Sequence, residues 1–144
     1  MNSLSPAMQE WLGSYVRSSG AVAGTVHLRQ GDGLALAAAI KIPPPVADAV
    51  RYVPWGKGMA GMALETGEAV QTCNLKEDET GRIKPGAKAV SALAAVALPL
   101  KDSTGAVTAV VGIAFMEERD IGQGEIDRLV AAASGIPIVS TNGA

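Results

Sequence analysis

The sequence predicts an α+β fold in which a single antiparallel sheet carries helices on both faces. Two tight glycine-containing turns, at 31–33 and 101–105, each join two apolar or alternating segments, and such hairpins pair their strands antiparallel. Apolar residues at helical spacing near both ends of the chain predict two terminal helices that cover one face. Shorter helical segments in the middle are left for the opposite face, where a pocket is expected beneath them.

The first expected element is a helix that runs from Pro6 to just before Gly20. Ser5 supplies a capping hydroxyl, and Pro6 stands where a missing N–H costs nothing. Gly20 then ends the helix. Its apolar residues fall on one face at helical spacing: Met8, Trp11, Leu12, Tyr15 and Val16.

From Ala21 the spacing of apolar residues changes to two, which predicts a strand, a turn at 31–33 and a returning strand. His27 falls on the more polar face of the first strand, so an exposed or helix-packed imidazole is expected. No second histidine exists to form a metal site with it. One face of the first strand holds Val22, Gly24, Val26 and Leu28, and one face of the second holds Leu34, Leu36, Ala38 and Ile40.

Three prolines at 43–45 interrupt the sheet and predict a short helix with Val46, Val50 and Val53 on its inner side. The segment 53–75 that follows is the most informative part of the chain. Gly56 and Gly58 precede an apolar helix over 59–65, which Gly67 ends in the left-handed conformation. The helix is too short to be stable alone, so it must pack on the rest of the fold.

The start of this helix suits a small ligand. Its free N–H groups lie beside the indole of Trp55, and a helix N-terminus next to an aromatic wall is typical of a binding site. A strand over 68–72 follows. Residues 74–88 are polar and carry charges of both signs, which predicts a long loop that is a functional lid or disordered.

Two apolar runs, 90–100 and 106–116, predict central strands that are covered on both faces. In the second run one face is expected to hold Val107, Val111, Ile113 and Phe115, and the other Val110, Gly112, Ala114 and Met116. The last helix carries an apolar stripe and ends at 135–137. The stripe consists of Ile126, Leu129, Val130 and Ala133.

The composition limits the classes of function. A chain of 144 residues, 48% hydrophobic and 18% charged, fits one globular domain, and no apolar run is long enough to span a membrane. The N-terminal segment lacks the pattern of a secretion signal, so a cytoplasmic protein is expected. A net charge of −2 argues against nucleic acid as a partner. The single cysteine, Cys73, excludes an internal disulfide and a cysteine-based metal cluster, and no cofactor is expected.

Four segments resemble, in order and spacing, the successive blocks of a GAF domain: GTVHLRQGDGLALAAAI, VPWGKGMAGMALETGEAVQTCNL, AVALPLKDSTGAVTAVVGIAF and GEIDRLVAAAS. The resemblance extends from Ala21 to Ser134 and is most specific at 53–75 and around Pro99–Val107. It implies a twisted antiparallel sheet of about six strands in a profilin-like layering, with terminal helices on one face and a ligand pocket on the other. Together with the apolar spacing of the first helix and the lack of periodicity after 135, it predicts a single GAF-like domain over 1–144, with an N-terminal helix in 1–20, a core in 21–134 and a flexible tail in 135–144.

The subclasses of this family differ in their markers. The cyclic-nucleotide signature is not matched, because no fitting Phe follows 74–76 and Phe115 precedes its acidic pair. Bilin-binding members attach the pigment through a cysteine next to a histidine in the lid, whereas Cys73 precedes the lid here. Members that reduce free methionine sulfoxide use several cysteines. The subclass that binds small anions such as nitrate stays open, with matching residues Trp55, Gly58, Met59 and Ala60.

The candidate ligand-binding residues are Trp55, Lys57, Gly58, Met59, Ala60, Met62, Cys73 and Leu93. Several have a structural alternative. Trp55 would otherwise plug the edge of the core, Lys57 would be a solvated turn residue, and Cys73 would be a small buried hydrophobe. The methionines Met59, Met62 and Met116 would fill the core. Asp102 and the acidic run 77–79 are expected to be solvated loop charges.

The sequence therefore predicts a non-catalytic sensor that binds a small molecule or anion, with neither nucleic acid nor membrane as partner. A lid over 74–88 that closes on the ligand and shifts the terminal helices would signal to a regulatory protein partner. Two alternatives stay open. One is an interaction module that forms a homodimer through its terminal helices without a ligand. The other is a methionine-sulfoxide-type reductase that uses Cys73 with an external thiol.

Overall fold

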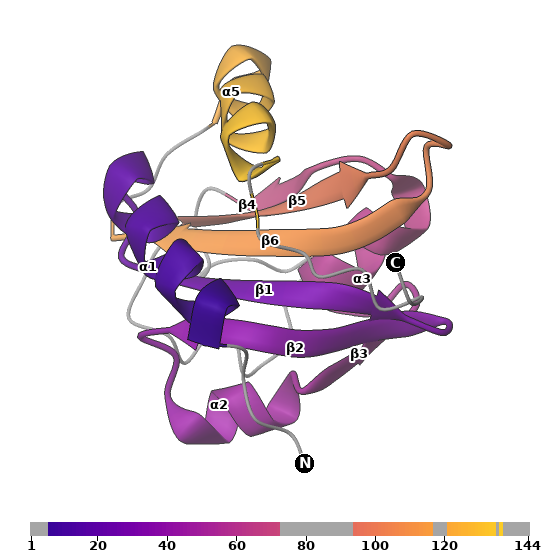
Figure 1. Ribbon diagram of the computed structural model, residues 1–144, viewed down its shortest axis with the longest axis horizontal. Coiled ribbons are helices and arrows are strands. Elements are labelled where there is room, and N and C mark those ends of the chain that lie inside the picture. The colour runs from indigo at the N-terminus through magenta and orange to yellow at the C-terminus, as the bar shows by residue number, and fades with distance from the viewer. Residues whose placement is uncertain (1–5, 73–93, 117–120, 135, 137–144) are drawn as a thin grey trace.

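One sheet of six strands, in the order β3-β2-β1-β6-β5-β4, forms the centre of the computed structural model (Figure 1). All neighbouring strands pair antiparallel. The structure describes residues 6–72, 94–116, 121–134 and 136. The elements are α1 (Pro6–Ser19), β1 (Ala23–Gln30), β2 (Gly33–Ile40), α2 (Pro44–Ala49), β3 (Tyr52–Pro54), α3 (Gly58–Thr66), β4 (Val70–Thr72), β5 (Ala94–Lys101), β6 (Val107–Phe115) and α5 (Gln123–Ala133). The predicted α+β class with a single antiparallel sheet is confirmed.

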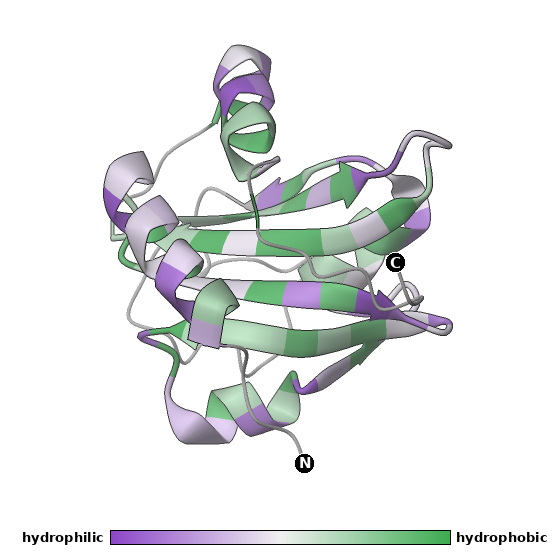
Figure 2. Ribbon diagram, viewed as in Figure 1, coloured by the Kyte–Doolittle hydropathy of each residue, from purple (hydrophilic) through white to green (hydrophobic). Residues whose placement is uncertain are grey.

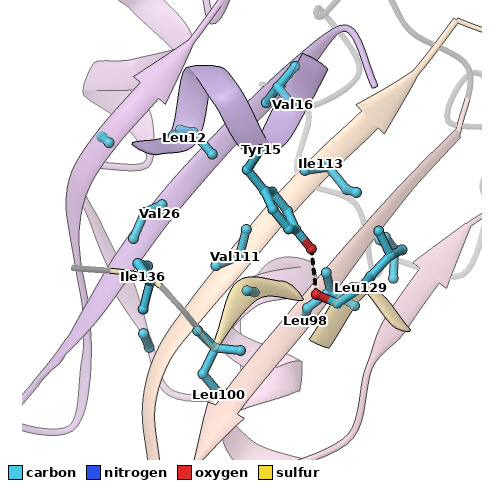
Figure 3. Packing of buried hydrophobic residues seen from close by; sticks show 14 of the residues in the cluster. Leu12, Tyr15, Val16, Val26, Leu98, Leu100, Val111, Ile113, Leu129 and Ile136 are labelled. Carbon is cyan, nitrogen blue, oxygen red and sulfur yellow. Dashed lines mark hydrogen bonds between the residues drawn. The ribbon is translucent and has the colours of Figure 1, made fainter. Parts of the chain in front are cut away.

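The two terminal helices, α1 and α5, pack on the same face of the sheet, as predicted. The hydroxyl of Tyr15 donates a 2.7 Å hydrogen bond to the carbonyl oxygen of Leu129 and so joins the two helices (Figure 3). Burial of this phenol raises its pKa well above the ordinary value. Large apolar side chains fill the space between the helices and the sheet, among them Met8, Leu12, Val16, Leu98, Val111, Ile113, Phe115, Ile126 and Leu129.

The two middle helices lie on the opposite face. Helix α3 packs on β5, β6 and β2 and buries Ala63 and Leu64 in a second apolar cluster. Helix α2 reaches the same face through Val46, which packs with Ala23 of β1. Hydrophobic residues occupy most of the central strands, whereas hydrophilic residues gather at the hairpin end of β1 and β2 (Figure 2). The central strands are therefore covered on both sides, as predicted.

Local signals set several boundaries where the sequence predicts them. Helix α1 begins at Pro6, and α2 begins within the run of prolines, with Pro43 preceding it and Pro44 as its first residue. Helix α3 ends at Gly67, whose φ of 71° is left-handed and lets its N–H donate to the carbonyl of Ala63. The first hairpin is one residue tighter than expected, since Gly33 already pairs with Gln30 and leaves a two-residue turn.

Two β-bulges overturn parts of the predicted alternation. The register between β1 and β2 shifts at Val26/His27, so Leu34 packs under α3 while Ala38 packs under α1. The prediction that these two residues share a face is wrong, because a bulge adds one residue and reverses the side on which later side chains point. A second shift at Leu100/Lys101 places Val107 under α3 with Val110, not with Val111 as predicted.

The sequence does not predict strand β3. Val53, expected on the inner side of the short helix, lies in β3 opposite Leu34, because α2 ends at Ala49 and the chain returns to pair with β2. Met116, expected on a covered face of its strand, is 56% exposed just beyond the end of β6. Both differences fall at element ends, where tertiary contacts decide the structure.

Two glutamine side chains bind backbone groups in pairs. The amide of Gln9 in α1 donates to the carbonyl of Ala39 and accepts a 3.0 Å hydrogen bond from the N–H of the same residue. Gln71 of β4 does the same with Ile121, at 2.8 and 2.9 Å. Each side chain thereby satisfies two backbone groups at once, as a neighbouring strand would.

Asp102 lies exposed in the turn between β5 and β6, in agreement with the expectation of a solvated loop charge. Its carboxylate accepts hydrogen bonds from the hydroxyl and the N–H of Thr104, and these bonds lower its pKa. The predicted lid at 74–88, the acidic run 77–79 and, apart from Ile136, the tail over 135–144 lie outside the described residues. Within the described parts of the chain, no helix is both long and apolar enough to cross a membrane.

Candidate functional site

A cavity of about 150 Å³ lies between the sheet and the two middle helices. Strands β1, β6 and β5 form its floor, and residues in and around α2 and α3 form its roof. The described residues that line it are Ala23, Gly24, Thr25, His27, Ile42, Val46, Val50, Val53, Lys57, Gly58, Met59, Ala60, Ala95, Val96, Ala97, Gly112, Ile113 and Ala114.

The strand register aligns small residues into the floor. Two adjacent rows run across β1, β6 and β5, and they consist of Ala23, Ala114 and Ala95 and of Thr25, Gly112 and Ala97. No side chain in these rows is longer than that of threonine, so the rows leave space between the sheet and the helices. A Cβ atom on Gly112 would lie only 3.0 Å from Oγ1 of Thr25, which shows how much of the space depends on the glycine.

The two roof helices differ in how firmly they are held. Helix α3 contributes Met59 and Ala60 to the cavity and is anchored by buried residues on the same side. Helix α2 has six residues, of which Val46 is buried, whereas α3 has nine, of which Gly61, Ala63 and Leu64 are buried. Helix α2 follows Lys41, whose φ of 60° lies in the left-handed region and costs roughly 1 kcal/mol for a residue with a side chain. The α2 side of the roof is therefore held by fewer buried residues than the α3 side.

His27 is the buried polar residue of the floor, with only 3% of its surface exposed. Its Nε2 lies 2.8 Å from the carbonyl oxygen of Val50. Because a carbonyl oxygen only accepts, Nε2 carries the proton in this hydrogen bond. The bond joins β1 to the residue that ends α2. Of the two placements predicted for His27, the helix-packed one is found.

Lys57 is the one charged residue among the described lining residues, and it is exposed. A lysine at an apolar surface usually keeps its ammonium group in water while its methylene groups cover the apolar side chains. Helix α3 begins directly after it without a side-chain cap. The positive end of the helix dipole and Lys57 therefore lie next to each other in the chain, and Lys57, Gly58, Met59 and Ala60 all line the cavity.

The structure brings four of the eight predicted site residues to the cavity: Lys57, Gly58, Met59 and Ala60. Trp55 is not among the lining residues; it is 45% exposed, and the guanidinium carbon of Arg29 lies 5.4 Å from its ring centroid. Met62 packs against the apolar cluster under α3. Cys73 and Leu93 lie outside the described residues.

The sequence reasoning missed the floor of the cavity. The sequence pattern places Ala95, Gly112 and Ala114 in ordinary apolar strands. It places Thr25 and His27 on the polar face of the first strand. A signal was present, since residues 111–115 of β6 alternate large residues with small ones. Only the pairing of β6 with both β1 and β5 turns that alternation into a continuous area of small side chains.

The fold is similar to solved structures at low sequence identity. The type II free methionine-R-sulfoxide reductase from Thermoplasma acidophilum is 14% identical with a TM-score of 0.69, over 88% of this chain and 84% of that one. The A. Aeolicus nlh2 GAF domain in an inactive state is 18% identical with a TM-score of 0.65, over 90% and 78%. Staphylococcus aureus NreA mutated in its nitrate binding site is 18% identical with a TM-score of 0.63, over 80% and 87%. At such identities the likeness extends to the fold alone.

The chain is an α+β domain with a pocket. Terminal helices cover one face of its antiparallel sheet, and a cavity lies beneath the middle helices on the other. The sequence model described as "GAF domain" matches residues 4–139, and the chain belongs to the GAF domain family. The resemblance noted in the sequence is thereby confirmed. No curated protein sequence matches the chain significantly.

Proposed function

We propose that this domain is a sensor that binds a small molecule in the cavity between the sheet and helices α2 and α3. The observation that carries the proposal is the cavity itself, about 150 Å³ in volume, beneath a roof whose two helices are held unequally. Concave sites of this kind, lined mainly by apolar side chains with few polar groups, are where proteins bind small ligands. Membership of the GAF domain family agrees with ligand sensing.

The contacts around α2 suggest how occupancy changes the protein. A ligand shifts a conformational equilibrium only if it contacts one state better than the other. In the described arrangement Val46 and Val50 lie on the cavity from above, and His27 reaches from the floor to the end of α2. A ligand between floor and roof stabilises this closed arrangement over one with α2 displaced. The predicted further step, from the lid at 74–88 to the terminal helices and a protein partner, stays a prediction.

Thermal shift and calorimetry test the proposal with a panel of nitrate, nucleotides, amino acids, tetrapyrroles and small ring compounds. A ligand at about 100 times its Kd stabilises the folded protein by about 2.7 kcal/mol. The variant Ala114→Leu fills the cavity and should lose the response. Ala35→Leu, the same change on β2 outside the cavity, should keep it. The absence of any saturable binder in such a panel would count against a sensor.

A homodimer through the terminal helices stays a second proposal, with a narrower basis than the sequence suggests. Most of the apolar stripe residues of α1 and α5 are buried in the core of the same chain, for example Leu12 and Leu129. Trp11 is the partly exposed residue of the α1 stripe, and its ring stacks on Tyr15 at 4.8 Å. Sedimentation of the wild type and Trp11→Glu decides: a folded monomer in both would exclude the dimer.

The reductase alternative depends on Cys73, which lies outside the described residues. It requires an external thiol, since the chain has one cysteine and cannot form an internal disulfide. Assay of free methionine sulfoxide reduction in the wild type and Cys73→Ser tests it, and equal activity in both proteins would end it. The absence of a catalytic role and the cytoplasmic location stay predictions.

A further inference from the structure

The size of the cavity restricts what it can hold. A cavity of the same volume, about 150 Å³, admits benzene in a protein where it was created by removing one side chain. Nucleotides and tetrapyrroles are several times larger than such a space. Here the floor and both roof helices bound the site, and Met59, Val46 and Val50 lie across from the small residues of the strands. A ligand of roughly one aromatic ring therefore matches this cavity in volume.

The lining restricts the chemistry. Among the described lining residues, Thr25, His27 and Lys57 have polar side chains, and the rest are apolar or glycine. Nε2 of His27 is already engaged with the carbonyl of Val50, and Lys57 is exposed. An anion in the interior would lose its hydration next to alanine, valine and methionine side chains, without a buried opposite charge among the described residues. An uncharged ligand has no such cost.

We propose that the ligand of this site is an uncharged, mainly apolar molecule of about the size of a single aromatic ring, such as a phenol or a small heteroaromatic compound. The inference rests on the proposed function and differs from the small anion that the sequence left open as one ligand class. The ring lies on the low floor formed by Ala95, Gly112 and Ala114. A single polar substituent of the ring lies on the side of Thr25 and His27, where the polar groups of the floor are.

The test compares uncharged rings with anions at equal concentration, on the full chain. Phenol, indole and benzene form one group of probes, and nitrate and formate form the other. Calorimetry gives the Kd, and amide chemical shifts locate the site. We expect saturable binding of at least one ring compound, with shifts at β6, α2 and the start of α3, and no saturable binding of either anion.

Two cavity variants and one matched control make the result specific. Ala114→Leu should weaken ring binding by at least about tenfold, because its side chain occupies the floor, whereas Ala35→Leu should stay within about twofold of the wild type. Gly112→Ala adds one methyl group near Thr25 and should weaken binding by about threefold. A thermal melt of each variant shows whether it folds. If Ala114→Leu does not fold, Gly112→Ala provides the test of the site.

The outcomes separate the two proposals. Saturable binding of nitrate or formate that is lost in Lys57→Gln, with no ring bound, would overturn the ligand class and leave the sensor function standing. Ring binding that Ala114→Leu and Gly112→Ala leave unchanged would overturn the site. No binding by these probes or by the larger panel above would overturn both the ligand class and the sensor function.

Discussion

The two faces of strand β6, over residues 111–115, are built from side chains of different size. In β6, Val111 and Ile113 project toward α1 and α5, while Gly112 and Ala114 project toward α2 and α3. On the first face these side chains belong to the large apolar cluster beneath α1 and α5, whereas the second face borders the cavity. Both faces are apolar, so polarity alone does not distinguish them. The comparison teaches that over residues 111–115 of β6 the two faces differ in side-chain volume rather than in polarity, whereas in β1 the cavity face carries the larger Thr25 and His27.

The largest effect is expected on the packed face. Leu12→Ala should cost roughly 2–5 kcal/mol of unfolding free energy, because Leu12 is fully buried and its neighbours cannot close the void. Urea denaturation measures it. Met59→Ala, on the roof of the cavity, should cost less, roughly 1–2 kcal/mol, since Met59 is only partly buried. Equal costs at both positions would mean that the two faces do not differ in packing.

A pair of helical glycines sharpens the comparison. Gly61→Ala in α3 should destabilise by roughly 1–3 kcal/mol, because the added Cβ would lie 2.6 Å from the carbonyl oxygen of Pro54, a backbone atom that cannot move easily. Gly13→Ala in α1 meets only side-chain atoms, at 3.6 Å or more, and should stabilise by about 0.5–1 kcal/mol through helix propensity. Thermal or urea unfolding of both variants gives the sign. If both substitutions destabilised the protein, the cost could not be assigned to the close backbone approach at Gly61, because Gly13 has no such approach.

Removal of the hydrogen bond between the terminal helices should change the free energy of unfolding by less, and this change should depend on pH. Tyr15→Phe removes the hydrogen bond to Leu129 and should cost about 1 kcal/mol near neutral pH. Burial raises the pKa of Tyr15 in the folded state, so the folded protein holds this proton more tightly than the unfolded chain does. The stabilising contribution of Tyr15 is complete below the unfolded pKa of about 10 and falls at higher pH.

Unfolding of wild type and Tyr15→Phe from pH 7 to pH 11 checks this prediction. The difference between the two proteins should shrink above about pH 10, since phenylalanine does not titrate. A difference that stays constant over this range would show that the Tyr15 phenol has the same pKa in both states. The comparison of the two proteins cancels the titration of all other groups.

The smallest effect is expected at Trp55, which belongs to neither face. Arg29→Met removes the cation–π contact with the exposed Trp55 ring and should cost less than about 1 kcal/mol. Arg17→Met, at an exposed position on α1, is the control. Because Trp55 does not line the cavity, Arg29→Met should also leave ligand affinity within about twofold of the wild type. A large loss of affinity would indicate that Trp55 takes part in ligand binding.

Most of the fold could be predicted from local signals in the sequence. Pro6, Gly67 and the turn at Gly31 set boundaries through backbone conformation, which acts on a few neighbouring residues. The bulges that redirect Leu34 and Val107 could not be predicted, because they depend on how two strands fit together. Strand β3 was missed for a related reason, since three residues form a strand there only by pairing with β2.

The candidate site could be predicted only in part. The segment 57–60 was found because glycines and a helix start mark it in the sequence. The floor was not found, because Ala95, Gly112 and Thr25 become neighbours only through the strand order β1-β6-β5. The place of Trp55 was not predictable either. The chain direction after Pro54 decides whether the indole turns toward the cavity or toward Arg29, and no local pattern records that direction.

The paired glutamine contacts have a consequence for natural variation. At Gln9 and Gln71 the side chain must offer one donor and one acceptor to the same peptide backbone. Glutamate has the right length but lacks the donor, and methionine has the right length but neither group. These two positions should therefore drift slowly among relatives of this chain, even though neither touches the cavity. If Gln9 and Gln71 are invariant among relatives, the reason would be the architecture of the domain and not its ligand.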